Sequence, residues 1–293
     1  MAGRQCLRAS LTIPLNKDMM KTFSTLWLIL TVLIFATSAW SAEKWKMVWH
    51  DEFDKNGPPD PANWNFEQGF VRNEEPQWYQ PENAICTNGL LAIEARAEHK
   101  PNPHYIPDSG DWATSRKWIT STSASLTTRG LHEFKYGKFE MRARIDTRNG
   151  SWPAFWTLGA NIGTVDWPAC GEIDIMEAYT GNVLANIDYE LNNDSLWSTV
   201  KKPLTQFPRN WSKKFHTWTM EWDDQKIDLL LDGKLMNHLD LAEADKADGG
   251  NPFRRPLYLI LNQALRTKDG APWESILPVR FEVDWVRVYQ RAN

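Results

Sequence analysis

Apolar and polar residues alternate one by one over several stretches of the chain, which is the spacing of a β-strand with one buried face. Three stretches show this most clearly, with inward positions at Phe139, Met141, Ala143 and Ile145, at His216, Trp218, Met220 and Trp222, and at Phe281, Val283 and Trp285. Helical spacing suits only residues 241–247, where we expect one short helix. The pattern therefore predicts an all-β chain.

Tight-turn sequences separate many of the predicted strands. Asn88-Gly89 and Asp232-Gly233 each lie between apolar runs, and both pairs favour the two-residue turns of β-hairpins. No repeat, low-complexity tract or flexible linker interrupts residues 43–293. We therefore predict a single domain over residues 43–293, built as a β-jelly-roll sandwich of two antiparallel sheets.

The first 41 residues have the composition of a secretory signal peptide. An apolar run at residues 26–35 follows Lys21 and precedes Ala39-Trp40-Ser41, a pattern suited to cleavage after Ser41. The run is shorter than the roughly 20 residues of a membrane-spanning helix. We expect a secreted or periplasmic protein with no membrane span after cleavage. Met19 would be a more typical start, so residues 1–18 are read as an extension.

Charge and cysteine content narrow the classes of partner. The chain has a net charge of −4, and residues 1–41 contribute +3 of the total, which leaves −7 for the exported part. An acidic chain without a basic stripe does not suit nucleic acid. Cys86 and Cys170 remain after cleavage; two buried free thiols are favoured, with a disulfide as the alternative. We expect a monomer.

Tryptophan is unusually frequent. The chain has 17 tryptophans, of which 15 fall in residues 43–293. Large aromatic faces are costly to expose unless a ligand covers them, and sugars present flat apolar faces to such rings. Each single tryptophan is more often a core residue, so the composition favours a carbohydrate-binding protein without establishing one.

Residues 171–177 combine three carboxylates with apolar neighbours. Glu172 and Asp174 are two apart and share a strand face, whereas Glu177 is five residues from Glu172 and would point the other way. Burying charged groups is costly unless they have a function. A β-bulge at about Ile175-Met176 would return Glu177 to the face of the other two, and bulges are frequent next to active sites.

Two glutamates on one face, with an aspartate between them, suit glycoside hydrolysis by double displacement. That chemistry needs carboxyl groups about 5–5.5 Å apart, one to attack the anomeric carbon and one to protonate the leaving oxygen. Crowding of three carboxylates keeps one protonated near neutral pH. The alternatives are a solvated acidic face on an edge strand and a calcium site.

Several motifs resemble glycoside hydrolase family 16, on its laminarinase-like side with a bulged catalytic strand. They are WPAFW at residues 152–156, WPACGEIDIME at 167–177, YGKFEMRAR at 136–144, NEEPQWY at 73–79 and VDWVRVYQ at 283–290. The resemblance spans about residues 45–290. It implies a jelly roll whose concave sheet forms an open cleft.

The resemblance also implies roles for individual residues. Glu172 would be the nucleophile, Glu177 the acid/base and Asp174 the residue that tunes both, without a cofactor for catalysis. Sugar contacts would come from Trp152, Trp156 and Trp167 by stacking, from Glu140 and Arg142 through hydroxyls, from Asn73 on the non-reducing side, and from Asn186, Asp188 and Asn262. A structural calcium ion would be held on the convex face by the Glu52 backbone and by Asp284.

Two departures from the family pattern concern the substrate. Asp188 stands where laminarinase-like members usually have a histidine, and the run after Asn262 lacks the usual glycines. We expect an endo-acting hydrolase of β-1,3-glucan. The alternatives are an algal galactan as substrate, for which Arg72, Arg142, Arg144 and Arg266 would suit sulfate, a transglycosylase, and a sugar-binding module without catalysis.

Overall fold

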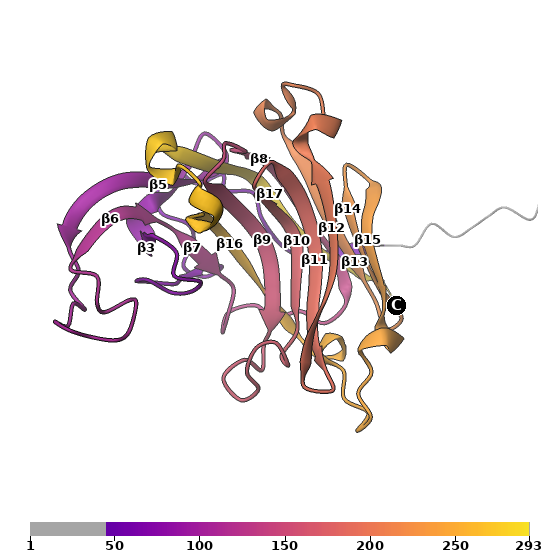
Figure 1. Cartoon of the computed structure of the whole chain (residues 1–293). Coiled ribbons are helices and arrows are strands. Elements are labelled where there is room, and N and C mark those ends of the chain that lie inside the picture. The colour runs from indigo at the N-terminus through magenta and orange to yellow at the C-terminus, as the bar shows by residue number, and fades with distance from the viewer. Residues whose placement is uncertain (1–44, 293) are drawn as a thin grey trace, which may run out of the picture. The chain divides into compact units, whose positions relative to one another are not determined.

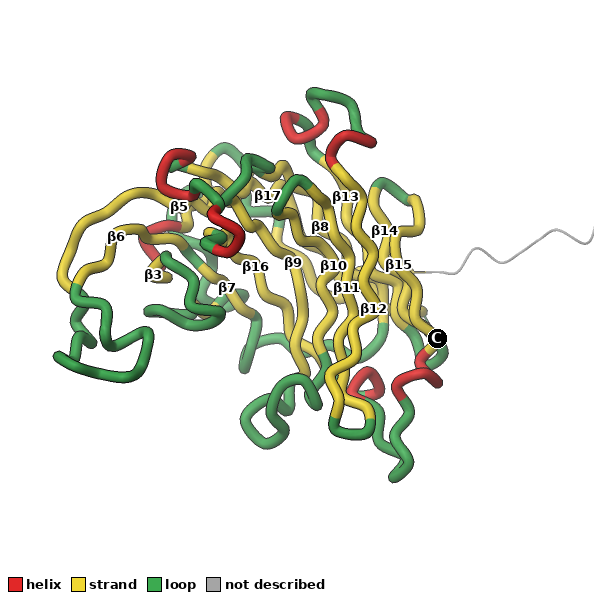
Figure 2. The backbone as a smooth tube through the Cα atoms, viewed as in Figure 1, coloured by secondary structure: helices red, strands yellow, loops and turns green. Residues whose placement is uncertain are grey.

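The structure, a computed structural model, describes residues 45–292, and the predicted signal peptide lies outside them. From Trp45 onward the chain forms one compact unit. Two β-sheets lie face to face in it, joined by loops and single turns of 3₁₀-helix (Figures 1 and 2). This arrangement confirms the predicted all-β sandwich.

The larger sheet has ten strands, eight of which form a continuous series of hydrogen-bonded neighbours. In spatial order they are β15 (Lys234–Asp240), β14 (Lys226–Leu231), β13 (His216–Trp222), β8 (Gly137–Ile145), β17 (Val279–Arg291), β5 (Leu90–Pro101), β6 (Trp118–Ser123) and β3 (Gln77–Tyr79). In addition, β1 (Trp45–Asp51) pairs with β17 and β4 (Ala84–Thr87) pairs with β5. The pairing of β3 with β6 is parallel, so this sheet is not fully antiparallel as predicted.

The smaller sheet has seven strands and is antiparallel throughout. Its order is β12 (Asp194–Pro203), β11 (Asn182–Leu191), β10 (Glu172–Tyr179), β9 (Ser151–Gly159), β16 (Leu257–Leu265), β7 (Ser125–Thr127) and β2 (Asn65–Phe66). The strand with the three carboxylates, β10, is therefore central, and β12 is an edge strand.

The 3₁₀-helices are short and lie in the connections. They are η1 (Pro81–Asn83), η2 (Leu204–Gln206), η3 (Trp211–Lys213), η4 (Leu241–Ala244), η5 (Pro252–Arg254), η6 (Lys268–Gly270) and η7 (Trp273–Ile276). The helix predicted at residues 241–247 is thus a single 3₁₀ turn. Among the described residues no helix is long and apolar enough to cross a membrane.

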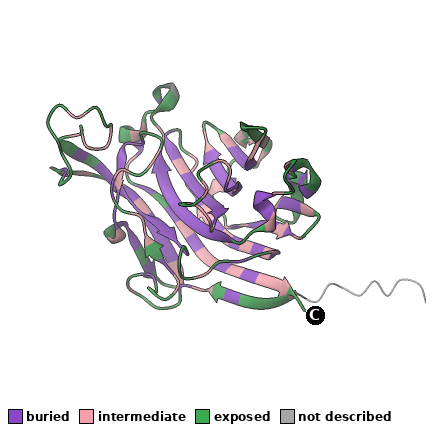
Figure 3. Ribbon diagram, turned by 90° about the horizontal axis from the view of Figure 1, so that it is seen from below, coloured by how far each residue is buried: buried purple, intermediate pink, exposed green. Residues whose placement is uncertain are grey.

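The core lies between the two sheets, where one side-chain set of each strand meets the other (Figure 3). The alternation predicted for β8 is confirmed, because Phe139 and Met141 are buried while Glu140 is not. The prediction for Trp285 is wrong. Because of a register shift between Val283 and Trp285, the next residue that points into the core is Val286. The alternation of apolar and polar residues alone does not reveal a bulge of this kind.

Both predicted hairpin turns are present. Asp232 and Gly233 have φ of 49° and 71° between β14 and β15, and Asn88 and Gly89 have φ of 52° and 73° between β4 and β5. Left-handed φ at both central residues is what a type I′ turn requires. Cys86 and Cys170 are buried free thiols, as favoured from the sequence.

Candidate active site

A bulge in β10 places the three carboxylates on one face. Along the neighbouring strand β9, Asp174 pairs with Trp156 and Met176 with Phe155, so Ile175 is the extra residue. Ile175 is 1% exposed and belongs to the core. Because the bulge restores the alternation one residue later, Glu177 points to the same side as Glu172 and Asp174, as predicted.

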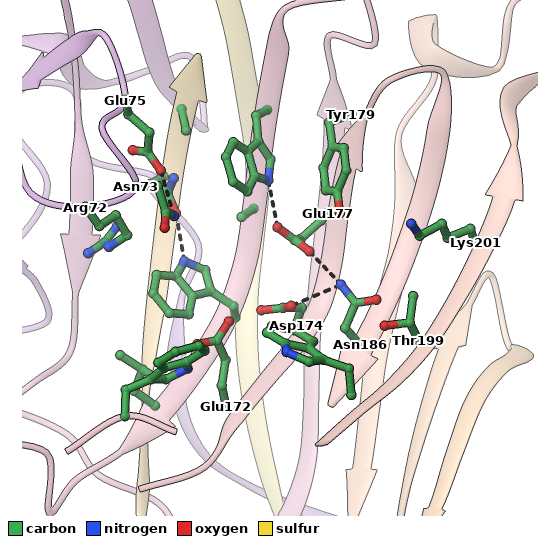
Figure 4. A pocket seen from close by; sticks show the side chains of 18 of the residues that line it. Arg72, Asn73, Glu75, Glu172, Asp174, Glu177, Tyr179, Asn186, Thr199 and Lys201 are labelled. Carbon is green, nitrogen blue, oxygen red and sulfur yellow. Dashed lines mark hydrogen bonds between the residues drawn. The ribbon is translucent and has the colours of Figure 1, made fainter. Parts of the chain in front are cut away.

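The carboxylates open into a cavity of about 580 Å³ on the face of the seven-stranded sheet that is turned away from the core. A volume of this size is in the range of small-molecule and oligosaccharide sites. Figure 4 shows Arg72, Asn73 and Glu75 on one side of the three carboxylates and Asn186, Thr199 and Lys201 on the other. The carboxylates therefore lie in the middle of a cleft that has polar side chains at both ends.

Two neutral donors hold the carboxyl group of Glu177. The Trp152 indole Nε1 donates to Glu177 Oε1 at 2.7 Å, and Asn186 Nδ2 donates to Oε2 at 2.6 Å. Burial raises the pKa of Glu177, while these hydrogen bonds oppose the shift. The group is therefore fixed in position and remains protonated to a higher pH than an exposed glutamate.

Asp174 lies between the two glutamates and is 3% exposed. The same Asn186 amide donates to its Oδ2 at 3.1 Å. Burial and the charges of Glu177 and Glu172 raise the pKa of Asp174 well above its ordinary range. A protonated Asp174 can donate a hydrogen bond to an ionised neighbour, which stabilises that neighbour's charge.

Glu172 begins β10 next to the rim of the cavity. Burial, together with the nearby charges of Glu177 and Asp188, raises its pKa to about 7, against the effect of hydrogen bonds from Asp174 and Trp167. The three carboxyl groups interact, so they titrate as one set. Near neutral pH the set carries fewer than three negative charges, which suits one nucleophile and one acid in the same cleft.

Asp188 is not among the residues that line the cavity. It is fully buried on β11 beside Glu172, where Ser195 Oγ donates to its Oδ1 at 2.8 Å and its Oδ2 has no partner among the described residues. Burial raises its pKa to about 6. Asp188 is therefore not placed for the direct sugar contact predicted for it, and its charge is one of the causes that raise the pKa of Glu172.

Aromatic rings form two walls of the cleft. Trp167, before β10, and Trp197, on β12, are 48% and 47% exposed, with ring centroids 6.4 Å apart. Trp152 and Tyr179 form the other wall, at 5.2 Å and edge to face. Trp156 is 7% exposed and lies in the cavity floor. Trp152 and Trp167 are thus open to a ligand, whereas Trp156 is mostly covered.

The end of the cleft near Asn73 is a hydrogen-bonded network. Asn262 accepts from the Trp156 indole at 2.7 Å and donates to the Tyr79 hydroxyl at 3.0 Å. Tyr79 donates in turn to Glu75, which also accepts from Asn73 at 3.2 Å. Asn73 and Asn262 both line the cavity, so the structure brings these two predicted residues together.

The structure corrects the predicted roles of Glu140 and Arg142. Both are on β8 of the ten-stranded sheet and do not line the cavity. Glu140 is paired with Lys138 at 3.0 Å, and Arg142 is paired with Asp284. These are the ion pairs that a charged outer face forms, and the alternation of β8 could not reveal which sheet carries the cleft.

The side chains of Glu52 and Asp284, the two residues predicted to hold calcium, have cationic partners. Arg142 occupies the carboxylate of Asp284, and Arg287 binds that of Glu52 through two hydrogen bonds of 2.9 and 2.8 Å. Among the side chains that the structure describes, no group of three His, Cys, Asp or Glu gathers as a metal site. The predicted contribution of Glu52 is its backbone, which the pairing of its side chain with Arg287 does not engage. The calcium site therefore stays a prediction, and no step of the proposed chemistry depends on it.

Sequence reasoning missed several residues that line the cavity, namely Glu75, Tyr179, Trp197, Thr199 and Lys201. The signal for three of them was present. Trp197, Thr199 and Lys201 are two apart on one face of β12, and β12 follows β11 through the turn at Asn192-Asn193. A hairpin read at that turn would have placed the three residues in the same sheet as the catalytic strand, two strands away from it.

Comparison with known proteins gives a consistent result. A model of glycosyl hydrolases family 16 matches residues 78–287. The β-glucanase of Rhodothermus marinus is 33% identical over 95% of this chain and 98% of its own length.

Solved structures agree. The laminarinase catalytic domain of Thermotoga maritima matches with a TM-score of 0.72 and 37% identity over 86% of this chain and 100% of that domain. A chain from work on endo-acting O-glycanases, with which human gut bacteria initiate mucin breakdown, matches with a TM-score of 0.77 and 34% identity over 86% of this chain and 92% of that one. With its carboxylates, aromatic walls and sheet order arranged as described, the chain belongs to glycoside hydrolase family 16.

Proposed function

We propose that the protein is a retaining endo-glycosidase that cleaves internal β-1,3-glucosidic bonds of a polysaccharide. The observation that carries this proposal is the bulge in β10, which gathers Glu172, Asp174 and Glu177 on one face in the middle of an open cleft. The chain's similarity to a β-glucanase and to a laminarinase supports glucan as the substrate.

The reaction uses the two glutamates in turn. The Glu172 carboxylate attacks the anomeric carbon while Glu177 gives its proton to the departing glycosidic oxygen, so that the C–O bond breaks and a glycosyl ester forms on Glu172. Glu177, now ionised, takes a proton from water, which displaces Glu172 from the sugar. Asp174 donates a hydrogen bond to whichever neighbour is charged.

Cleavage inside a chain follows from the position of the carboxylates. Side chains line the cavity on both sides of them, from Arg72 and Asn73 at one end to Thr199 and Lys201 at the other. Sugar units can therefore be bound before and after the scissile bond. The half-exposed rings of Trp167 and Trp197 give these units apolar surfaces on which to pack.

A galactose-containing glycan is the second candidate substrate. It is favoured by the 26% identity, over 89% of this chain, to a keratan-sulfate endo-1,4-β-galactosidase of Sphingobacterium multivorum and by Asp188, which departs from the laminarinase-like pattern. The Glu172 and Glu177 chemistry is the same for both substrates. Interception of the glycosyl ester by sugar instead of water would give a transglycosylase from the same intermediate.

The chain would act outside the cytoplasm as a monomer. The apolar run at residues 26–35 and the small residues before Ala42 support export and cleavage after Ser41. N-terminal sequencing of the protein recovered from the medium or periplasm should begin at Ala42, and sedimentation should give the mass of one chain.

Product analysis tests the activity. We expect release of reducing ends from laminarin, with oligosaccharides of several lengths appearing early, because an endo-acting enzyme cuts at many points. Proton NMR should find the β-anomer first, since two displacements retain configuration. Release from β-1,4-galactan, keratan sulfate or mucin O-glycans, with none from laminarin, would instead establish the galactose-containing substrate. An α-anomer as first product would exclude Glu172 as nucleophile.

A further inference from the structure

The edge strand β12 contributes a row of side chains to the cleft. Trp197, Thr199 and Lys201 are exposed and line the cavity, whereas Ser198, between them, is less exposed and donates to Asn237. This alternation fixes which face of β12 is turned to the ligand. The end of the cleft over β11 and β12 is therefore a surface with a ring, a hydroxyl and an ammonium group.

Asn186, next to this row on β11, has an acceptor without a partner. Its Nδ2 donates to Asp174 and to Glu177, which leaves its Oδ1 as the atom that can accept from another group. Its Oδ1 is buried and has no hydrogen-bond partner among the described residues. A buried unpaired acceptor is costly, so a ligand hydroxyl at this point would stabilise the site.

The two basic residues that line the cavity differ in their partners. Arg72, at the far end, is paired with Glu67. Lys201 forms no ion pair with any side chain that the structure describes, although it lies in a cavity that also holds four carboxyl groups. Its ammonium group and the Thr199 hydroxyl lie on the same side of the carboxylates (Figure 4), and that hydroxyl likewise has no hydrogen-bond partner in the described part of the chain.

Lys201 is well separated from the catalytic acid. It pairs with Leu184 on β11, which pairs with Glu177 on β10, so two strand spacings, roughly 10 Å, separate the backbones of Lys201 and Glu177. An anionic group bound at Lys201 would therefore meet little repulsion from the catalytic carboxyls, because burial reduces the negative charge that these carboxyls carry.

We propose that the β11–β12 end of the cleft binds a sugar that carries an anionic substituent, a sulfate ester or a carboxylate. Lys201 and Thr199 bind the anionic group, Asn186 Oδ1 accepts from a hydroxyl of the same sugar, and Trp197 packs against its apolar face. This inference rests on the proposed glycosidase function and narrows its substrate to a charged glycan.

The test compares charged and neutral forms of one polysaccharide. Wild type and the Lys201→Gln variant are assayed on laminarin, on partially sulfated laminarin and on laminarin partly oxidised to uronic acid. The ratio of kcat/KM for charged over neutral substrate should fall about ten- to a hundredfold in Lys201→Gln, since charge-assisted hydrogen bonds are strong. The charged form that loses more identifies sulfate or carboxylate as the preferred group.

Matched variants separate this role from others. Lys202→Gln alters the next residue, which faces away from the cavity, and should leave the ratio unchanged; Lys201→Arg should largely restore it. An unchanged ratio in Lys201→Gln would overturn the proposal. So would a shift of the pH profile on neutral laminarin with the ratio intact, because Lys201 would then act on the catalytic carboxyls.

The same comparison of charged and neutral substrates can be made on a different polysaccharide. If wild type cleaves none of the laminarins, the proposed β-1,3-glucan activity fails, and the ratio is measured on keratan sulfate and its desulfated form. If no backbone is cleaved, calorimetric titration of the Glu172→Gln protein with the same pairs replaces kinetics. Equal affinity for charged and neutral forms would then overturn the role of Lys201 independently of activity.

Discussion

The outward faces of the two sheets both carry charged residues in alternating positions, but the carboxylates on the two faces have different kinds of partner. On the ten-stranded sheet carboxylates have basic partners, as in Lys138–Glu140 at 3.0 Å and Arg144–Glu282 at 2.6 Å. On the seven-stranded sheet, Glu177 is held instead by an indole and an amide. Charges in ion pairs are neutralised by their partners and take no part in chemistry, whereas the crowded carboxylates of the cleft keep raised pKa values.

The difference has a physical cause in what surrounds each face. Ion pairs on the open face of the ten-stranded sheet remain hydrated, so each contributes little to stability and nothing to chemistry. In the cleft, burial penalises the charged form, and the bulge forces Asp174 to lie between two glutamates. A charged alternating strand therefore does not identify a binding face; the partners of its charges do.

The largest expected effect separates the two faces directly. Glu172→Gln should lower kcat by about 10⁴-fold or more, because it removes the nucleophile. Glu140→Gln on the other sheet breaks only a surface pair and should change kcat less than about twofold. Steady-state assays on the polysaccharide, with circular dichroism to verify folding, measure both. Comparable losses in the two variants would abolish the distinction between the faces.

The second effect concerns the acid. Glu177→Gln should lower the rate on polysaccharide by about 10²–10⁴-fold, since general acid catalysis typically contributes that much. On an aryl glycoside with a good leaving group, most of the rate of glycosyl-enzyme formation should return because the departing oxygen needs no proton. Burst kinetics measure that step. Near-normal hydrolysis of polysaccharide by Glu177→Gln would assign the acid to another residue.

The third effect distinguishes cleft rings from core rings. Trp218→Ala should lower the free energy of unfolding by about 3–5 kcal/mol, because Trp218 is 1% exposed and lies in the core. Trp167→Ala should change unfolding little, and should weaken binding of laminari-oligosaccharides to the Glu172→Gln protein by about 1–3 kcal/mol. Urea unfolding and calorimetry give the two values. Unchanged affinity would make Trp167 part of the scaffold.

The smallest effect is a pH dependence of stability. The folded state raises the pKa of Glu172 from 4.5 to about 7, so between these values the unfolded state has released a proton that the folded state still holds, and stability falls as pH rises. Glu172→Gln removes this loss. Its unfolding free energy relative to wild type should rise by on the order of 1 kcal/mol from about pH 4.5 to about pH 8. A flat difference would mean that replacing Glu172 does not change the number of protons that the set of three carboxyls binds on folding.

Much of the fold and the centre of the site followed from local patterns. Alternation predicted the strands, Asp232-Gly233 predicted a hairpin, and the spacing of Glu172, Asp174 and Glu177 predicted the bulge between them. Each of these signals is contained within a few neighbouring residues. Their physical cause, a backbone period or a required φ, acts locally.

What failed required knowledge of the tertiary arrangement. Glu140 and Arg142 alternate like the residues of a binding strand, but which sheet forms the cleft is decided by strand order, which no single strand encodes. Trp197 and Lys201 reach the site through the pairing of β12 with β11. Asp188 shares a face with Asn186 and accepts a hydrogen bond from Ser195 on β12, a contact that the alternation of β11 alone does not reveal.

The extra residue in β10 has a consequence for insertions and deletions in this strand. With Ile175 removed, the sequence would read Glu172-Ile173-Asp174-Met176-Glu177, a regular alternation in which Met176 takes the inward place of Ile175 and the three acids keep their side. Removing a residue between Glu172 and Asp174 would instead put the two on opposite sides of the strand. The catalytic strand should therefore tolerate deletion of Ile175 and should not tolerate deletion of Ile173, two residues earlier.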